Sequence, residues 1–459
     1  MYEPSENMLK QMITSIKKYK KRLLLFALLI ATSLLLSFTV FSIHSSIRQS
    51  RMRSAFLEDF DYMITVLEEN FPTLGVVYRR NGVDLLALAS EVRADLASRR
   101  RLDFETFWTV LRDDFLRYAR PVGHLHLIDN YMRLSLGWSN RADSHIRPIL
   151  SSSPSDPAYL LISRPAPPPS GPNLISNIID DGRIAYLRIS RMRWLPGTAR
   201  DFEISYLNDF YASIGGFEHL IIDIRGNPGG LLYFFNYWIV GPLVQGPTPF
   251  SAEFYHFYYG GKHNNNFFSA IQINAPPWMS EADKIAQNRA VQRFGRHFDL
   301  FLHSVAEIND EAMVRLFGDE MIHSQYSHIF DEIMNMDYYF IEARYVWGRL
   351  PRSPFDGRVW LLTDEMSRSA AQVAAAFSKE AGFATLVGEP TGGMAVTPWS
   401  SNFFALPNSG IIIRYDPTLV TDTRGRPLEY GTEPHFFNRP GLDALQTVLE
   451  LIAEGVYWD

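Results

Sequence analysis

The longest apolar stretch of the chain lies near its N-terminus, from Leu23 to Ile43. These 21 residues carry no formal charge, and at about 1.5 Å per residue a helix of this length just crosses a hydrocarbon core of about 30 Å. Six basic residues precede the stretch and three follow it by residue 53, so the positive-inside rule places residues 1–22 in the cytoplasm. The pattern predicts a transmembrane helix at 23–43, with everything after it outside the cytoplasm.

A cleaved signal peptide is the alternative for this stretch. The apolar run is longer than the apolar region of a typical signal peptide, and no A-x-A-like cleavage site follows it. We therefore expect an uncleaved, single-pass anchor in the cell membrane.

A helical pattern follows the anchor. Apolar residues recur at spacings of three and four through Phe60, Met63 and Leu67, and the same spacing returns at 85–96 and 104–116. The pattern predicts a small helical cap subdomain over residues 54–135.

The next stretch, residues 136–176, changes character. It reads as short strands followed by a linker, because five prolines gather between Pro165 and Pro172 and such a run cannot be helical. A second domain is expected to begin after this linker.

Four short apolar runs of strand length occur further along, each near a helix-like segment. They are residues 183–189, 220–224, 359–362 and 384–387. Strands that alternate with helices predict an α/β domain, which we place at residues 177–455. Its end, Leu442–Ala453, has the pattern of an amphipathic helix. Residues 247–354, with their aromatic and polar stretches, are treated as an insertion.

Composition narrows the classes of function. The hydrophobic share of 46% and the charged share of 20% are those of an ordinary globular protein. The chain has 44 Lys+Arg and 50 Asp+Glu, of which nine and two precede residue 54, so the remainder carries a net charge of about −13. This charge disfavours a nucleic-acid partner. The absence of cysteine excludes disulfides, a thiol nucleophile and thiolate metal sites.

Two segments carry candidate chemistry. The first, residues 219–230, is an apolar strand that ends in the turn Asp223-Ile-Arg-Gly-Asn-Pro-Gly-Gly230, and a glycine-rich turn can aim backbone N–H groups at an anion. The second, residues 359–377, passes from a strand through a turn into an alanine-rich helix with Ser369 at its start. Taken alone, the first segment is a strand and a loop, and Ser369 is a helix N-cap.

Taken together and in this order, the segments resemble the C-terminal processing (tail-specific) and tricorn core protease family. Its hallmarks are a strand ending in Asp-x-Arg-x-Asn-x-Gly-Gly and a later Ser-Ala-x-Glu on a strand-to-helix turn. Residues 183–189 resemble the family's opening strand, residues 386–393 the strand and turn after the nucleophile helix, and residues 430–435 the closing Gly-x-x-Pro-Asp. The resemblance covers about residues 177–455.

The resemblance implies a fold and an activity. The fold would be α/β, with a crotonase-like spiral ββα peptidase core. The activity would be that of a serine peptidase with Ser369 as nucleophile, a peptide or protein as substrate, and no metal or other cofactor. The reaction would be acyl transfer from the peptide to the serine, followed by hydrolysis.

The chain departs from one branch of the family at the position of the base. In the bacterial processing branch a lysine about two dozen residues after the serine acts as base, whereas this chain has Met394 there, and a thioether cannot accept the proton. In the tricorn-like and nisin-resistance-protein-like branch the base is a histidine in a Gly-His context within the preceding subdomain. Gly123-His124 matches that context, so the resemblance implies His124 as base.

His126 is the fallback for the base, because residues two apart in a strand share a face. His-x-His is also a metal-ligand spacing, but the remaining ligands of a metal site are not visible. A purely structural role for both histidines is the third possibility.

The resemblance to tricorn also implies a supporting glutamate near the closing motif. Glu429 fits best, with Glu433 as alternative, although either could be a solvated surface residue. The oxyanion hole is expected from Gly229, Gly230 and the backbone N–H of Ala370.

Gln372 stands where the family usually has glutamate. Glutamine has the same side-chain length as glutamate and can still form hydrogen bonds, but it carries no charge.

Together these observations predict a membrane-anchored, extracytoplasmic serine endopeptidase. A non-catalytic peptide- or ligand-binding protein on the same fold, as in the interphotoreceptor retinoid-binding proteins, is the alternative, and the missing lysine and glutamate support it.

Overall fold

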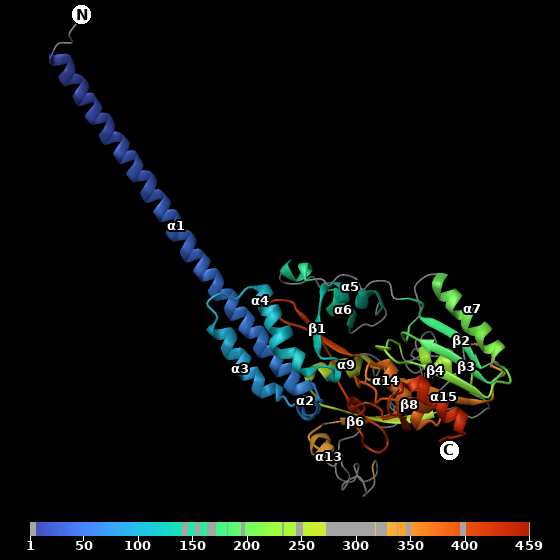
Figure 1. Cartoon of the computed structure of the whole chain (residues 1–459). Helices are drawn as coiled ribbons and strands as arrows, with labels where there is room; N and C mark the ends of the chain where they lie inside the picture. Colours follow the sequence, from blue (N-terminus) through green and yellow to red (C-terminus); the bar gives the residue numbers. More distant parts are fainter. Residues whose placement is uncertain are drawn as a thin grey trace, which may run out of the picture.

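The structure is a computed structural model of the whole chain (Figure 1). It describes residues 6–458 apart from 140–145, 152–156, 163–170, 181, 194–197, 232–233, 245–250, 272–316, 318–327, 337, 346–349 and 395–400. Most of the predicted proline-rich linker and much of the predicted insertion at 247–354 lie outside the described residues.

The chain begins with α1 (Glu6–Asn70), a single helix of 65 residues that extends far from the rest of the molecule (Figure 1). Within the described residues it is the one helix long and apolar enough to cross a membrane, a property that an anchor and a signal sequence share. Its last turns are different, because Phe60, Met63 and Leu67 are buried in the core of the cap. The apolar segment therefore continues into the cap without a loop.

Residues 56–120, within the region expected to form a helical cap, are mainly helical. After α1 come α2 (Leu74–Asn81), α3 (Leu85–Ser98), α4 (Phe104–Thr109), the π-helix η1 (Val110–Phe115) and the 3-10 helix η2 (Leu116–Ala119). The rings of Phe56 and Phe107 stack at 4.7 Å between centroids. Asp84 begins α3, since its carboxylate accepts hydrogen bonds from the backbone N–H groups of Leu86 and Ala87.

The prediction of short strands in residues 136–176 is wrong for most of the described part. The chain instead forms α5 (Asn130–Ser139), α6 (Ile146–Ser151) and the 3-10 helix η4 (Pro157–Leu161), and β2 starts only at Leu174. Ile146, Leu150 and Tyr159 are buried against the cap. These short helices are stabilised by that packing, which local sequence preference does not reveal.

The centre of the α/β part is a six-stranded sheet in the order β12-β8-β7-β4-β3-β2. Its strands are β2 (Leu174–Asp180), β3 (Ile184–Ile189), β4 (His219–Asp223), β7 (Arg358–Thr363), β8 (Thr385–Gly388) and β12 (Phe436–Phe437). All neighbours are parallel except β2 with β3. The four predicted apolar runs thus form adjacent strands.

Helices cover both faces of this sheet. One face packs with α7 (Thr198–Ser213) and α14 (Ala370–Glu380), and the other with the C-terminal α15 (Ala444–Glu454). Trp360 and Leu362 of β7 face α15, whereas Leu361 faces α14, in keeping with the period of two along a strand. The predicted α/β class is confirmed.

Two smaller sheets join the cap to the α/β part. In one, β1 (His126–Ile128) pairs with β10 (Ile412–Tyr415), which pairs with β9 (Asn402–Ala405). In the other, β5 (Ser251–Tyr258) lies between β6 (Tyr338–Tyr345) and β11 (Leu419–Thr421). A strand from residues 126–128 is therefore held against a strand nearly 300 residues further along the chain.

The remaining described elements connect these parts. They are η3 (Val122–His124), η5 (Phe235–Val240), α9 (Lys262–Ile271), α13 (His328–Ile333) and η6 (Leu428–Tyr430). Asn264 of α9 binds the end of α1, because its backbone N–H donates to Asn70 Oδ1 at 3.0 Å and its side-chain amide donates to Asn70 O at 2.8 Å. Part of the predicted insertion thus contacts the cap.

Candidate active site

Ser369 lies in the turn between β7 and α14. Its φ is +56°, an unusual backbone conformation for a residue with a side chain, and its N–H donates to Gly393 O at 3.0 Å. The Ser369 side chain makes no capping hydrogen bond to α14. The N-cap role therefore does not account for this serine, and its Oγ is directed elsewhere.

His124 lies at the end of η3, directly before β1. Both Gly123 (φ +60°) and His124 (φ +46°) have left-handed backbone conformations. A Cβ at Gly123 would come within 2.4 Å of the Phe71 ring and 2.8 Å of Thr73 Oγ1, so only glycine fits there. The Gly-His pair is thus a backbone requirement of the turn that positions the imidazole.

The two side chains meet although they are 245 residues apart in sequence. His124 Nε2 lies 3.1 Å from Ser369 Oγ, and His124 Nδ1 lies 2.7 Å from Asp416 Oδ2. His126, the fallback, is in β1 opposite Arg414 of β10. A hydroxyl, an imidazole and a carboxylate in this order form the hydrogen-bonded chain that activates a serine nucleophile.

Asp416, which supplies the carboxylate hydrogen-bonded to His124, was not predicted from the sequence. It is fully buried directly after β10, its Oδ1 accepts a hydrogen bond from Ser401 Oγ at 2.6 Å, and its N–H donates to Gly123 O at 2.7 Å. The available signal was an acidic residue three positions after the apolar run Ile411–Ile413. That signal could not reveal the pairing of β1 with β10, which brings Asp416 to His124.

Burial lowers the pKa of His124 below its ordinary value. The negative charge and hydrogen bond of Asp416 oppose this shift, while the positive charge of Arg414 adds to it. The pKa of His124 is lowered overall, so the imidazole is neutral at neutral pH. A neutral imidazole next to a serine hydroxyl can accept its proton.

Glu429, the predicted supporting carboxylate, lies beside this chain of residues but does not contact the imidazole. Its side chain is buried, and its Oε2 accepts a hydrogen bond from the N–H of Met394 at 3.1 Å. Arg80 of the cap donates to the backbone carbonyl of Glu429. Glu433, the alternative, is exposed and forms an ion pair with Arg426.

Burial, reinforced by the nearby charge of Asp416, raises the pKa of Glu429 to about 8. The positive charge of Arg80 and the nearby backbone of Gly123 and Met394 oppose the shift without cancelling it. At neutral pH the Glu429 carboxyl is therefore mostly protonated. Its Oε2 accepts the N–H of Met394, next to the Gly393 carbonyl that accepts the N–H of Ser369, whereas its Oε1 is buried without a hydrogen-bond partner.

This carboxyl predicts a pH dependence of stability. Between the ordinary value of 4.5 and about 8, folded Glu429 keeps a proton that the unfolded chain has lost, so the free energy of unfolding falls as pH rises through this window. Each pH unit by which the folded and unfolded pKa values differ changes the free energy of unfolding by about 1.4 kcal/mol. Glu429→Gln cannot ionise and should escape the loss.

Thermal melting of wild type and Glu429→Gln at pH 5 and pH 9 measures this difference. Glu433→Gln, at an exposed position, is the matched control and should behave as wild type does. Equal loss of Tm between pH 5 and pH 9 in wild type and Glu429→Gln would contradict the assignment.

Gln372 of α14 holds the segment that contains Glu429. Its amide nitrogen donates to Leu428 O at 3.0 Å and Thr432 Oγ1 at 3.1 Å, and its amide oxygen accepts from the N–H of Thr432 at 3.2 Å. These bonds need a donor and an acceptor on one side chain. Glutamine supplies both, whereas an ionised glutamate would supply only acceptors.

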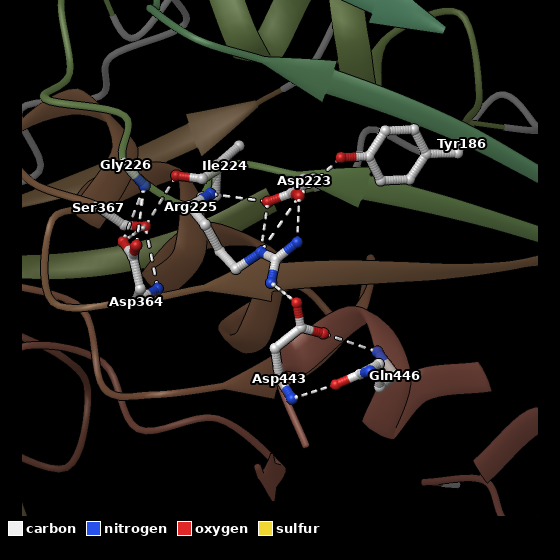
Figure 2. Close-up of polar contacts among 9 residues, drawn as sticks. All are labelled: Tyr186, Asp223, Ile224, Arg225, Gly226, Asp364, Ser367, Asp443 and Gln446. Carbon is white, nitrogen blue, oxygen red and sulfur yellow. Dashed lines mark hydrogen bonds and ion pairs between the residues drawn. The ribbon is translucent and has the colours of Figure 1, made fainter. Parts of the chain in front are cut away.

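The glycine-rich turn after β4 is fixed by charged side chains. Figure 2 shows Arg225 between the carboxylates of Asp223, at 2.7 Å from Oδ2, and Asp443, at 3.2 Å. Asp443 also begins α15 by a capping box with Gln446. The N–H of Gly226 donates to both carboxylate oxygens of Asp364, at 2.9 and 3.0 Å. The turn after β4 is thereby tied to the turn that leads to Ser369.

The end of this turn lies directly against the serine. A Cβ at Gly229 would come within 2.7 Å of Ser369 Cβ and of the Ala370 nitrogen, so close approach requires glycine there. The N–H of Gly229 already donates to Asn227 Oδ1 at 2.9 Å. Within the described residues, the N–H groups of Gly230 and Ala370 have no hydrogen-bond partner.

Comparison with known families agrees with the site. Residues 303–437, which include Ser369 and Asp416, match the model of peptidase family S41. The predicted resemblance to the tail-specific protease family is confirmed, and the chain is a serine peptidase related to family S41. No curated protein matches the chain.

Several solved structures are similar to this one. A putative peptidase from Parabacteroides merdae has 14% identity and a TM-score of 0.48, with 87% of this chain and 96% of that chain covered. Mature CPAF complexed with lactacystin has 13% identity and a TM-score of 0.48, with coverages of 88% and 97%. The photosystem II D1 C-terminal processing protease has 11% identity and a TM-score of 0.39, with coverages of 88% and 98%.

Proposed function

We propose that this serine peptidase is a membrane-anchored endopeptidase that acts outside the cytoplasm. Ser369 is its nucleophile, His124 its general base and Asp416 the carboxylate that orients the imidazole. The observation that carries this proposal is the continuous hydrogen-bonded chain from Ser369 Oγ through His124 to Asp416, with distances of 3.1 and 2.7 Å.

The proposed reaction has two halves. His124 takes the proton of Ser369 Oγ as the oxygen attacks the carbonyl carbon of the peptide bond, and the resulting imidazolium gives that proton to the leaving amine. The acyl group remains on Ser369. In the second half His124 takes a proton from water as the water oxygen attacks the acyl carbon, and the imidazolium returns that proton to Ser369 Oγ as the acyl–oxygen bond breaks and the carboxylic acid leaves.

Two backbone donors are proposed for the oxyanion of each tetrahedral intermediate. They are the N–H groups of Ala370, which follows Ser369, and of Gly230, which follows the Gly229 that lies against Ser369, because neither N–H has a partner among the described residues. Gly229 is assigned a different part of the task. Its missing side chain lets the turn approach Ser369, while its N–H stays bonded to Asn227.

Glu429 is proposed to position the site without exchanging protons with substrate. Its carboxyl accepts a hydrogen bond from the N–H of Met394, the neighbour of Gly393, which accepts the N–H of Ser369. Met394 takes part through its backbone only, since its thioether has no useful basicity.

The membrane anchor and its orientation rest on the N-terminal sequence. The side chains described between residues 23 and 43 are exposed, as expected for a segment that contacts lipid, and the basic residues before Leu23 favour a cytoplasmic N-terminus. We also retain the crotonase-like spiral topology that the family resemblance implies.

A membrane-impermeant fluorophosphonate probe tests activity and orientation together, because an activated serine displaces its fluoride and becomes phosphonylated. We expect labelling of the full chain in right-side-out vesicles without detergent, and in inside-out vesicles only after detergent. Ser369→Ala should abolish the label, whereas Ser98→Ala, at an exposed serine of α3, should keep it.

Each outcome of this experiment decides one part of the proposal. Absence of label on wild type in detergent would contradict the peptidase mechanism and favour a binding protein. Labelling of intact inside-out vesicles would reverse the proposed orientation and leave the mechanism standing.

A further inference from the structure

One cation beside the proposed catalytic residues has no role in the mechanism above. Arg414 is in β10, the middle strand of its sheet, opposite His126 of β1 on one side and Phe403 of β9 on the other. Side chains two residues apart in a strand share a face. Arg414 is therefore on the face of the sheet that also presents Asp416, the partner of His124.

The register of β1 and β10 puts Arg414 opposite His126, two residues from His124, and its charge affects the reacting groups. Its positive charge acts on His124 and on Asp416, and the residue is partly exposed. No hydrogen bond or ion pair joins Arg414 to Asp416 among the described residues, although the negative charge of Asp416 favours the charged guanidinium; the Asp416 carboxylate is hydrogen-bonded to His124 and Ser401. The guanidinium is thus near the site but is not held by it.

Within the described residues, the Arg414 guanidinium makes no hydrogen bond and no ion pair, and its Nε is buried without a partner. Other arginines around the site are satisfied. Arg79 pairs with Glu332, Arg80 donates to Glu429 O and to Gly392 O, and Arg225 pairs with Asp223.

An unpaired, partly buried guanidinium is costly for a folded protein. The cost is offset when an anionic ligand completes the site. A guanidinium is planar and presents N–H donors in a fork that matches a carboxylate. The ligand that a peptidase brings to this place is its peptide substrate, and the anionic group of a peptide is a carboxylate.

We propose that Arg414 binds a carboxylate of the peptide substrate close to the scissile bond, and so makes the enzyme prefer acidic substrates. The carboxylate belongs to an Asp or Glu side chain or to the C-terminus of the peptide. This inference rests on the proposed function, since it assumes that peptide is cleaved at Ser369.

Matched peptides test the preference. A fluorogenic peptide that the enzyme cleaves is prepared with Glu or Gln at each position flanking the scissile bond, and with a free or an amidated C-terminus. In wild type, kcat/KM for one Glu peptide should exceed that for its Gln counterpart by about tenfold or more, the size expected of a charge-assisted pair. If kcat/KM differs instead between the peptide with a free C-terminus and the peptide with an amidated C-terminus, Arg414 binds the terminal carboxylate.

Variants connect the preference to Arg414. Arg414→Gln should bring the ratio close to one, and Arg414→Lys, which keeps the charge but loses the fork, should retain part of it. Arg101→Gln removes one exposed positive charge of the cap and should leave the ratio unchanged. Labelling of Ser369 by the neutral fluorophosphonate probe reports an intact site in each variant.

Two results would overturn the assignment to Arg414. One is a wild-type enzyme that discriminates neither Glu from Gln nor acid from amide. The other is an equal loss of kcat/KM on all peptides in Arg414→Gln, which would make the arginine a structural or electrostatic element. Either result with Ser369 still labelled would leave the proposed function intact, whereas loss of wild-type labelling would contradict the proposed function itself.

Discussion

Ser369→Ala and His124→Ala are each expected to lower kcat by a factor of about 10⁴–10⁶, and the double variant should be scarcely slower than either single one. The reason is that nucleophile and base act as one unit, as their 3.1 Å contact indicates. Steady-state kinetics on a cleaved peptide measures the effects, and circular dichroism checks that the variants fold.

His126→Ala is the matched control, because this histidine is two residues away on the neighbouring strand. It should keep most of the activity. Near-normal turnover in His124→Ala would contradict the assignment of the base, and inactivity of His126→Ala alone would move the base to that residue.

The same mechanism sets the sign of the pH dependence. His124 must be neutral to accept the serine proton, so kcat/KM should fall as pH falls through the pKa of His124. Because burial lowers that pKa, the acid limb should have its midpoint below 6.5.

Asp416→Asn is expected to lower kcat by about 10⁴-fold while leaving the fold in place. An amide at this position can donate to the imidazole and favour the wrong tautomer, and it cannot stabilise the imidazolium that forms during the reaction. The measurement is kcat together with fluorophosphonate labelling of Ser369, which should slow in parallel.

Glu429→Gln separates the two buried acids near the site. Its carboxyl is already mostly protonated at neutral pH, so the variant should retain far more activity than Asp416→Asn. A larger loss in Glu429→Gln than in Asp416→Asn would identify Glu429 as the carboxylate that matters for His124.

Local pattern was sufficient to predict most elements of the sheet and the cap. The strands at residues 184–189, 219–223 and 358–363 have continuous apolar centres at 184–187, 220–222 and 359–362, as expected of strands covered on both faces. The cap helices follow apolar spacings of three and four. The prediction of strands was wrong for the described residues from 136 to 161, because the end of α5, α6 and η4 depend on packing against the cap, which no local pattern encodes.

Some residues of the candidate site could likewise be predicted from local sequence and others could not. Ser369 and His124 stand in short glycine-dependent turns that sequence motifs retain, and the structure brings them within hydrogen-bond distance. Asp416 belongs to no such motif. Its position depends on the pairing of β1 with β10, a contact between distant segments that a single sequence does not specify.

The unbroken course of α1 has a consequence for the proposed membrane protein. From Ile43 to Phe56, the first of its residues buried in the cap, the helix rises about 20 Å. A flexible tether would let the peptidase lie down on the bilayer and cut close to the lipid headgroups, whereas this stiff stalk sets a minimum height for cleavage. The peptidase would then select peptide bonds by their distance from the membrane surface as well as by the sequence around them.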